Sequence, residues 1–417
     1  MRTLQTIGEL AGRTVGLWWQ FLAPLIVWCS LGFAVHELAF FLSARLGAAH
    51  QTPATLVFIL GVVALVCSYV LMIHSTVPGL RLTRPQTSQH PVAQVLPGEL
   101  FDSQSGVGSV ARALGPFLAV YAVWGLVDSE VTDLFSINIL YNGLGGVDQW
   151  SINLSRFWFY LTLAVVAWVV RIALDQLRRR VRWTFLEFPA MAVEGIWVFA
   201  SFITALTVVD VVVAWITTRV AWSWLLGLWR SALELLPELS MPWGLTLPAS
   251  VERFVGWLIA DVLPAVGEHV VLPLMWLALA ATVFGWHRFT SADVLAGTRI
   301  GTGLQRLGER LPSGRVRAVS FWATGDLRVK YLPVLQALRL LLHSGPRVLG
   351  AFILLSTVID VGTEWLMVGV ARILGPLPYD LALGVEPTVR LITTLIEMPL
   401  LVALYAAAFE RVIRAVR

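Results

Sequence analysis

Long apolar runs separated by short polar segments dominate the chain. A helix of about 20 apolar residues crosses the hydrocarbon core of a membrane, so windows of that length identify candidate spans. They lie near residues 15–41, 53–77, 112–127, 157–174, 190–215, 267–286, 347–371 and 389–409. The third and fourth runs are the shortest. The pattern predicts an all-α polytopic membrane protein with about eight transmembrane helices arranged as hairpins.

The composition supports a membrane protein and argues against a soluble domain or a nucleic-acid-binding protein. Hydrophobic residues make up 57% of the 417 residues and charged residues only 13%, with 19 tryptophans. These values are far from those of a soluble domain. The net charge is only +4, and the basic residues are not interleaved with stacking aromatics, so we expect no nucleic-acid partner. Nearly all basic residues are arginine, a usage typical of a GC-rich bacterial genome.

The arginines also predict an orientation. Basic residues that flank membrane spans are retained in the cytoplasm. With the N-terminus inside, most of the arginines fall on the cytoplasmic side and both termini are cytoplasmic. The first apolar run is too long for the core of a signal peptide, so we expect it to remain as an anchor. The predicted location is a bacterial cytoplasmic (inner) membrane.

A short string around a carboxylate occurs twice. Residues 207–211 read Thr-Val-Val-Asp-Val and residues 357–361 read Thr-Val-Ile-Asp-Val, and a weaker match follows each of them. The two pairs of matching strings have different spacings, and an insertion at 216–266, between the fifth and sixth spans, accounts for the difference. This indicates an internal repeat of two hairpins. The predicted units are an N-terminal half, 1–188, with spans one to four, and a C-terminal half, 189–417, with spans five to eight.

Carboxylates inside apolar helices are the first candidates for a functional site. An acid in a membrane helix is costly, so it usually faces a protein interior or a water-filled path. Asp360 lies past the midplane of its span, Glu364 lies one turn further, and Glu397 lies near the middle of the last span. We predict that these three face the inside of the bundle, with Asp210 as a fourth candidate. If they do not converge, the site hypothesis fails.

A second set of polar candidates lies at the outer face. His36 and Glu37 end the first apolar run and Asp128 ends the third. A histidine beside carboxylates can transfer protons at neutral pH, so an intramembrane enzyme acting on a lipid-linked substrate is one alternative function. We favour a position of Asp128 at the lipid headgroups, where an acidic side chain costs little free energy. Residues 128–156 are interpreted as an outer acidic loop with a turn at Asn142-Gly143.

Amphipathic segments flank the spans. The insertion 216–266 predicts two Trp-rich helices in the outer interface, which contact lipid or a partner through Trp222, Trp224, Trp229 and Trp257. An equally weighted alternative is that these two helices only cover the outer end of the helix bundle. The basic segment 287–346 predicts cytoplasmic helices that bind anionic lipid headgroups or dock a partner.

No enzyme, nucleotide or metal motif is complete in the chain. We therefore expect a non-enzymatic transport component or membrane-complex subunit that handles ions or lipophilic molecules, without a cofactor or metal. The alternatives are the intramembrane enzyme and a purely structural subunit. Membrane lipids, other membrane proteins or a second copy of the chain are the expected partners.

Overall fold

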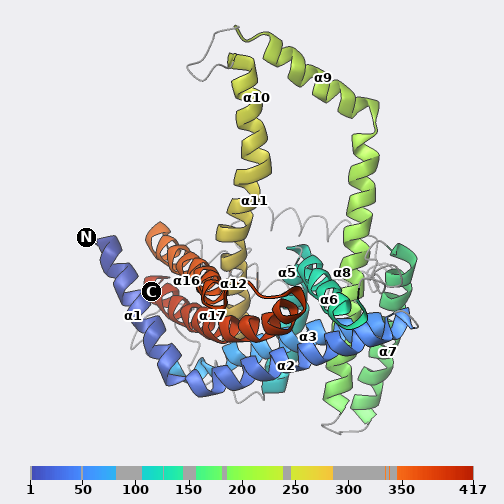
Figure 1. Ribbon diagram of the computed structural model, residues 1–417, viewed down its shortest axis with the longest axis vertical. Helices are drawn as coiled ribbons and strands as arrows, with labels where there is room; N and C mark the ends of the chain where they lie inside the picture. The colour runs from blue at the N-terminus through green and yellow to red at the C-terminus, as the bar shows by residue number, and fades with distance from the viewer. Residues whose placement is uncertain are drawn as a thin grey trace, which may run out of the picture.

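The computed structural model describes residues 2–47, 50–80, 106–124, 126–143, 156–180, 186–237, 246–284, 334, 338 and 345–416. Its elements are helices throughout these ranges (Figure 1). Seven are long and apolar enough to cross a membrane, and a shorter apolar helix covers Ala113–Ala122. The predicted class, an all-α polytopic membrane protein, is confirmed. The third predicted span corresponds to the short helix, which leaves seven long spans rather than eight.

The described helices of the first half are α1 (Arg2–Gln20), α2 (Leu22–Leu46), α3 (Gln51–Ser75), η1 (Val77–Gly79), α5 (Gly106–Val123), α6 (Leu126–Asn142) and α7 (Phe157–Arg180). Those of the second half are α8 (Glu187–Thr217), α9 (Val220–Glu234), α10 (Leu247–Trp257), η5 (Leu258–Val262), α11 (Leu263–Val266), η6 (Gly267–Val271), α12 (Leu272–Val283), α16 (Pro346–Leu374) and α17 (Tyr379–Val416).

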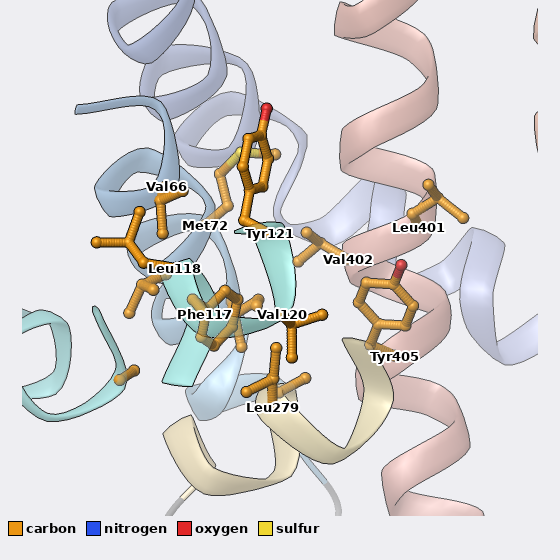
Figure 2. Close-up of a cluster of buried hydrophobic side chains, with 14 of the residues drawn as sticks. Val66, Met72, Phe117, Leu118, Val120, Tyr121, Leu279, Leu401, Val402 and Tyr405 are labelled. Carbon is orange, nitrogen blue, oxygen red and sulfur yellow. The ribbon is translucent and has the colours of Figure 1, made fainter. Parts of the chain in front are cut away.

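The bundle is built around α2, α3 and α17. Helices α2 and α3 form a closely packed hairpin, and α17 packs on α1, α16, α2 and α3. Figure 2 shows how α3, α5, α12 and α17 contribute Val66, Phe117, Leu279 and Val402 to one cluster of buried side chains. Helix association in lipid depends on close packing because the lipid tails are as apolar as the side chains. The interior of the bundle provides that packing.

Small residues bring α2 and α3 together. A Cβ atom on Gly32 would lie 2.1 Å from the Ser68 hydroxyl oxygen, so only glycine fits at this position. The same holds where α8 crosses α3, because a Cβ on Gly195 would lie 2.6 Å from a Val63 methyl group. Close approach through small residues is a common way of joining helices in membranes.

Two segments differ from the sequence prediction. The predicted first span, 15–41, is divided at Phe21 between α1 and α2, and α2 continues to Leu46. The predicted outer loop that begins at residue 128 is instead a helix, α6, because its acids find partners inside the bundle. The turn at Asn142-Gly143 is where this helix ends, and Gly143 has a φ of 65°, a left-handed conformation that favours glycine.

Residues 205–271 form a projecting structure that we call the arm. It comprises the end of α8, then α9, α10, η5, α11 and η6, and it rises from the bundle as an arch (Figure 1). Most of its described residues are exposed. The second predicted Trp-rich helix of the insertion 216–266 and the predicted span 267–286 form one helical run, Leu247–Val283, which includes two short π-helical turns. The predicted cytoplasmic helices in 287–346 lie almost entirely outside the described residues.

Candidate functional site

Two groups of charged side chains lie at two levels of α17. The first, the Arg390 cluster, consists of Arg390, Glu386, Glu37, His36, Glu130, Asp133 and Tyr121. The second, the Arg13 cluster, consists of Arg13, Glu410, Arg414, Glu9 and Arg411. The carboxylates Glu397 and Asp360 lie between these levels.

Arg390 joins three helices through its guanidinium group. Its Nη2 donates a hydrogen bond to Glu37 Oε1 of α2 at 2.9 Å, and its Nη1 donates to the carboxylate of Asp133 in α6. Its Nε lies 3.4 Å from Glu386 Oε1, one turn away in α17. Arginine suits this position because its planar group offers five donors in a fixed geometry. The burial of Asp133 raises the pKa of its carboxyl, and Arg390 acts in the opposite direction.

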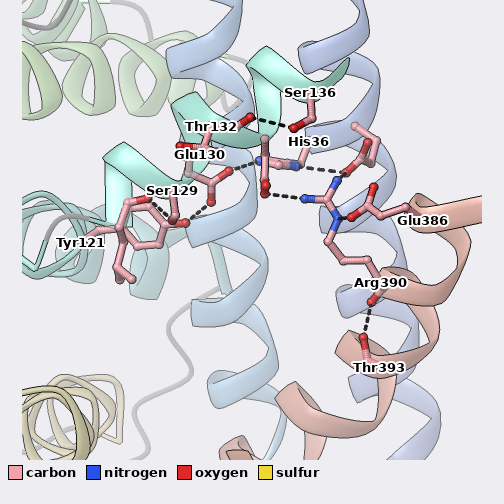
Figure 3. A network of polar contacts seen from close by, with 12 residues as sticks. His36, Tyr121, Ser129, Glu130, Thr132, Ser136, Glu386, Arg390 and Thr393 are labelled. Carbon is pink, nitrogen blue, oxygen red and sulfur yellow. Dashed lines mark hydrogen bonds and ion pairs between the residues drawn. The ribbon is translucent and has the colours of Figure 1, made fainter. Parts of the chain in front are cut away.

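The cluster continues through a buried histidine. His36 Nε2 lies 2.8 Å from Glu130 Oε2, and the Tyr121 hydroxyl donates to the other oxygen of Glu130. His36 Nδ1 lies 3.8 Å from Glu37, so the chain of polar groups runs from Tyr121 in α5 to Glu386 in α17 (Figure 3). His36 and Glu130 are only 4% and 6% exposed. Buried charges persist only when paired, so this chain ties α2, α5, α6 and α17 together.

The Arg13 cluster fixes the other end. Arg13 Nε donates to Glu410 Oε2 at 3.0 Å, and its Nη2 donates to the Gly79 carbonyl at 2.7 Å. Glu410, 2% exposed, also accepts from Arg414. Because α1 and the end of α17 are joined here, the two chain termini lie at the same end of the bundle (Figure 1).

Between the clusters, α16 and α17 bring two acids together. Glu397 and Asp360 are half-buried, and Glu397 lies within range of the Asp360 charge. The buried Thr363 lies near Glu397, and its hydroxyl donates a hydrogen bond to the Asp360 carbonyl at 2.8 Å. Pro399, two positions further along α17, leaves the Leu395 carbonyl without its usual helical donor. The line of contact between α16 and α17, which we call the seam, therefore has polar groups in otherwise apolar surroundings.

The predicted intramembrane candidates divide into two groups. Asp360 and Glu397 lie on the packed helices α16 and α17, with Glu397 within range of the Asp360 charge. Glu364 is exposed on α16 and lies within range of both acids. Glu268 and His269 of η6 also lie within range of Asp360. Asp210 does not join them, because it is exposed on the part of α8 that belongs to the arm.

The outer-face candidates also divide. His36 and Glu37 lie together, but His36 pairs with Glu130 and Glu37 pairs with Arg390. The side chain of Asp128 is outside the described residues. The sequence analysis missed Arg390, Glu130, Asp133 and Tyr121 as site residues. One signal was available: an arginine at the start of the last span, at the same predicted depth as Glu37 and the acids near residue 130.

The described part of the chain contains no group of three or more His, Cys, Asp or Glu side chains arranged to hold a metal ion. No family model, no curated protein and no solved structure matches the chain. The fold and its apolar helices define a multi-pass helical membrane protein.

Proposed function

We propose that this chain is a non-enzymatic transport component of a bacterial inner membrane and that it handles ions. The observation that carries the proposal is the position of Glu397. It lies on α17 between two partly buried charge clusters, near a second acid, Asp360, and a buried hydroxyl, Thr363.

The spacing of the clusters supports a transmembrane placement of α17. Twenty positions separate Arg390 from Glu410, and at the rise of an α-helix this is about 30 Å, the thickness of a hydrocarbon core. Charged groups at both limits and an apolar stretch between them are typical of a helix that crosses a bilayer. Glu397 is then about 10 Å inside the Arg390 cluster.

An acidic side chain at this depth in a membrane carries a free-energy cost that a function can explain. Insertion of an acid at the centre of a membrane helix costs about 2.5–3.5 kcal/mol, and such residues commonly mark ion or proton pathways. Glu397 and Asp360 could share and release a proton or bind a small cation, with Thr363 as a neutral ligand. The polar seam between α16 and α17 is the proposed route.

The proposed orientation has both termini in the cytoplasm. The joined ends of α1 and α17 support a common side for the two termini, and the arginine distribution favours the cytoplasm as that side. The basic segment 287–346 would then face anionic headgroups of the inner leaflet.

The environment of His36 favours transport over the enzyme alternative. A general base must reach its substrate, yet His36 is buried against Glu130 and linked to the Arg390 cluster. We therefore propose that His36 and Glu37 hold the bundle together.

Reconstitution tests the proposed function. The full chain in liposomes containing a pH-sensitive dye should take up protons when an inward pH gradient is imposed with K⁺ and valinomycin to balance charge. A parallel assay with Na⁺ or K⁺ gradients tests cation movement. Ion fluxes equal to those of protein-free liposomes in every condition would contradict the proposal.

A further inference from the structure

We infer that the arm, residues 205–271, is the surface through which this chain associates with a second copy of itself. The exposed end of α8 is apolar on all sides. Val208, Val209, Val211, Val212 and Val213 are 45–63% exposed, although successive residues point around the whole helix. A helix that is apolar all round belongs in lipid or in a protein interior.

Lipid alone does not suit this surface, because the arm also exposes charges. Asp210 lies among the valines of α8 and Asp261 lies on η5, and both are exposed. Arg219, Arg230 and Arg253 are exposed on the same arm. Charged groups are costly in hydrocarbon, and large apolar side chains are unfavourable in water. A protein surface with both apolar and charged groups is the environment that suits all of them.

A second copy provides such a surface. The arm carries acids and arginines together, so it is complementary in charge to itself. In a two-fold symmetric dimer the same patch is used by both subunits, and the acids of one can pair with the arginines of the other. Two tryptophans of the arm are exposed, Trp224 of α9 by 75% and Trp257 of α10 by 51%. Exposed indoles of this kind commonly anchor protein interfaces.

The direction of the arm agrees with a neighbouring copy. Figure 1 shows α8, α10 and α11 running along the long axis of the molecule, whereas α2 and α17 run across it. If α17 crosses the membrane, as proposed above, α8 and the run Leu247–Val283 do not cross it, although they are long and apolar enough to do so. The arm then extends sideways from the bundle towards adjacent proteins. This step rests on the proposed placement of α17, whereas the composition of the arm does not.

Charge reversal with complementation tests the inference. An acid-reversed chain carries Asp210→Arg, Glu234→Arg, Glu252→Arg and Asp261→Arg, and an arginine-reversed chain carries Arg219→Glu, Arg230→Glu and Arg253→Glu. Differently tagged copies are co-expressed and purified in lipid nanodiscs, where co-purification and particle mass are measured. Wild-type copies should co-purify as a dimer. Each reversed chain should lose self-association by at least about tenfold, because like charges then face each other.

The mixture of the two reversed chains should restore association, which also shows that both are folded. Reversal of the exposed pair Asp175 and Arg178 on α7, outside the arm, is the matched control and should change nothing. The inference is overturned if wild-type chains are monomeric, if a different protein co-purifies in place of a second copy, or if reversed chains self-associate normally. Failure of the mixed pair to associate would also contradict it. Because association is measured without ion flux, this result is independent of the transport assay.

Discussion

Replacing Arg390 with alanine should destabilise the bundle more than any other single removal of an exposed or half-buried arginine. The variant leaves Glu37, Asp133 and Glu386 without the guanidinium that joins them. Removal of one partner from a fully buried ion pair costs about 3–5 kcal/mol because the remaining charge is uncompensated. The loss here should be smaller because the Asp133 and Glu386 side chains are 41% and 48% exposed and are screened by solvent. A fall in the midpoint of thermal unfolding in mild detergent is the expected result.

Two further variants sharpen this prediction. Arg390→Lys keeps the charge but not the planar set of donors, so its stability should be intermediate. Arg372→Ala removes an exposed arginine from the end of α16 and should have little effect. An Arg390→Ala protein as stable as Arg372→Ala would show that the cluster does not hold the helices together.

Glu397→Gln should abolish the proposed ion flux in liposomes and leave the fold intact. Glutamine has nearly the same shape as glutamate, but it can neither release a proton nor carry a charge. The flux should fall to that of protein-free liposomes, while the thermal midpoint stays close to that of the wild type.

Glu364→Gln is the matched control for this variant. Glu364 lies in the same region but is exposed on α16, so the flux of the variant should be largely retained. If Glu397→Gln transports at the wild-type rate, the carboxylate of Glu397 is not on the ion route. Equal losses in the two variants would indicate a diffuse electrostatic effect rather than a specific site.

The helices of the bundle could largely be predicted from the sequence. Backbone groups in lipid must be satisfied within a helix, so long apolar runs such as those of α3 and α17 become helices of matching length. The positions of Glu397 and Asp360 along their helices could be counted from the sequence, whereas their depth in a membrane stays a prediction. The position of α6 could not be predicted, because its acids resemble those of a solvated loop until their buried partners are known.

The Arg390 cluster was beyond sequence reasoning for a related reason. Its members come from α2, α5, α6 and α17, far apart in the chain, and no local pattern links Glu130 to His36 or Arg390 to Asp133. Likewise, the Asp210 and Asp360 strings read alike, but one lies on the arm and the other at the seam of α16 and α17. Similar local sequences do not determine which face a neighbouring helix covers.

The central claim is that α17 crosses the membrane with Glu397 between its two charged ends, and cysteine labelling tests it most directly. Cys29 and Cys67 are first replaced by serine, and single cysteines are placed at Leu381, beside the Arg390 end, at Ile396, next to Glu397, and at Leu4 in α1, beside the Arg13 end. In intact cells a membrane-impermeant maleimide should label Leu381→Cys, should reach Leu4→Cys only after permeabilisation, and should leave Ile396→Cys unlabelled. Labelling of Leu381→Cys and Leu4→Cys from the same side would contradict the account.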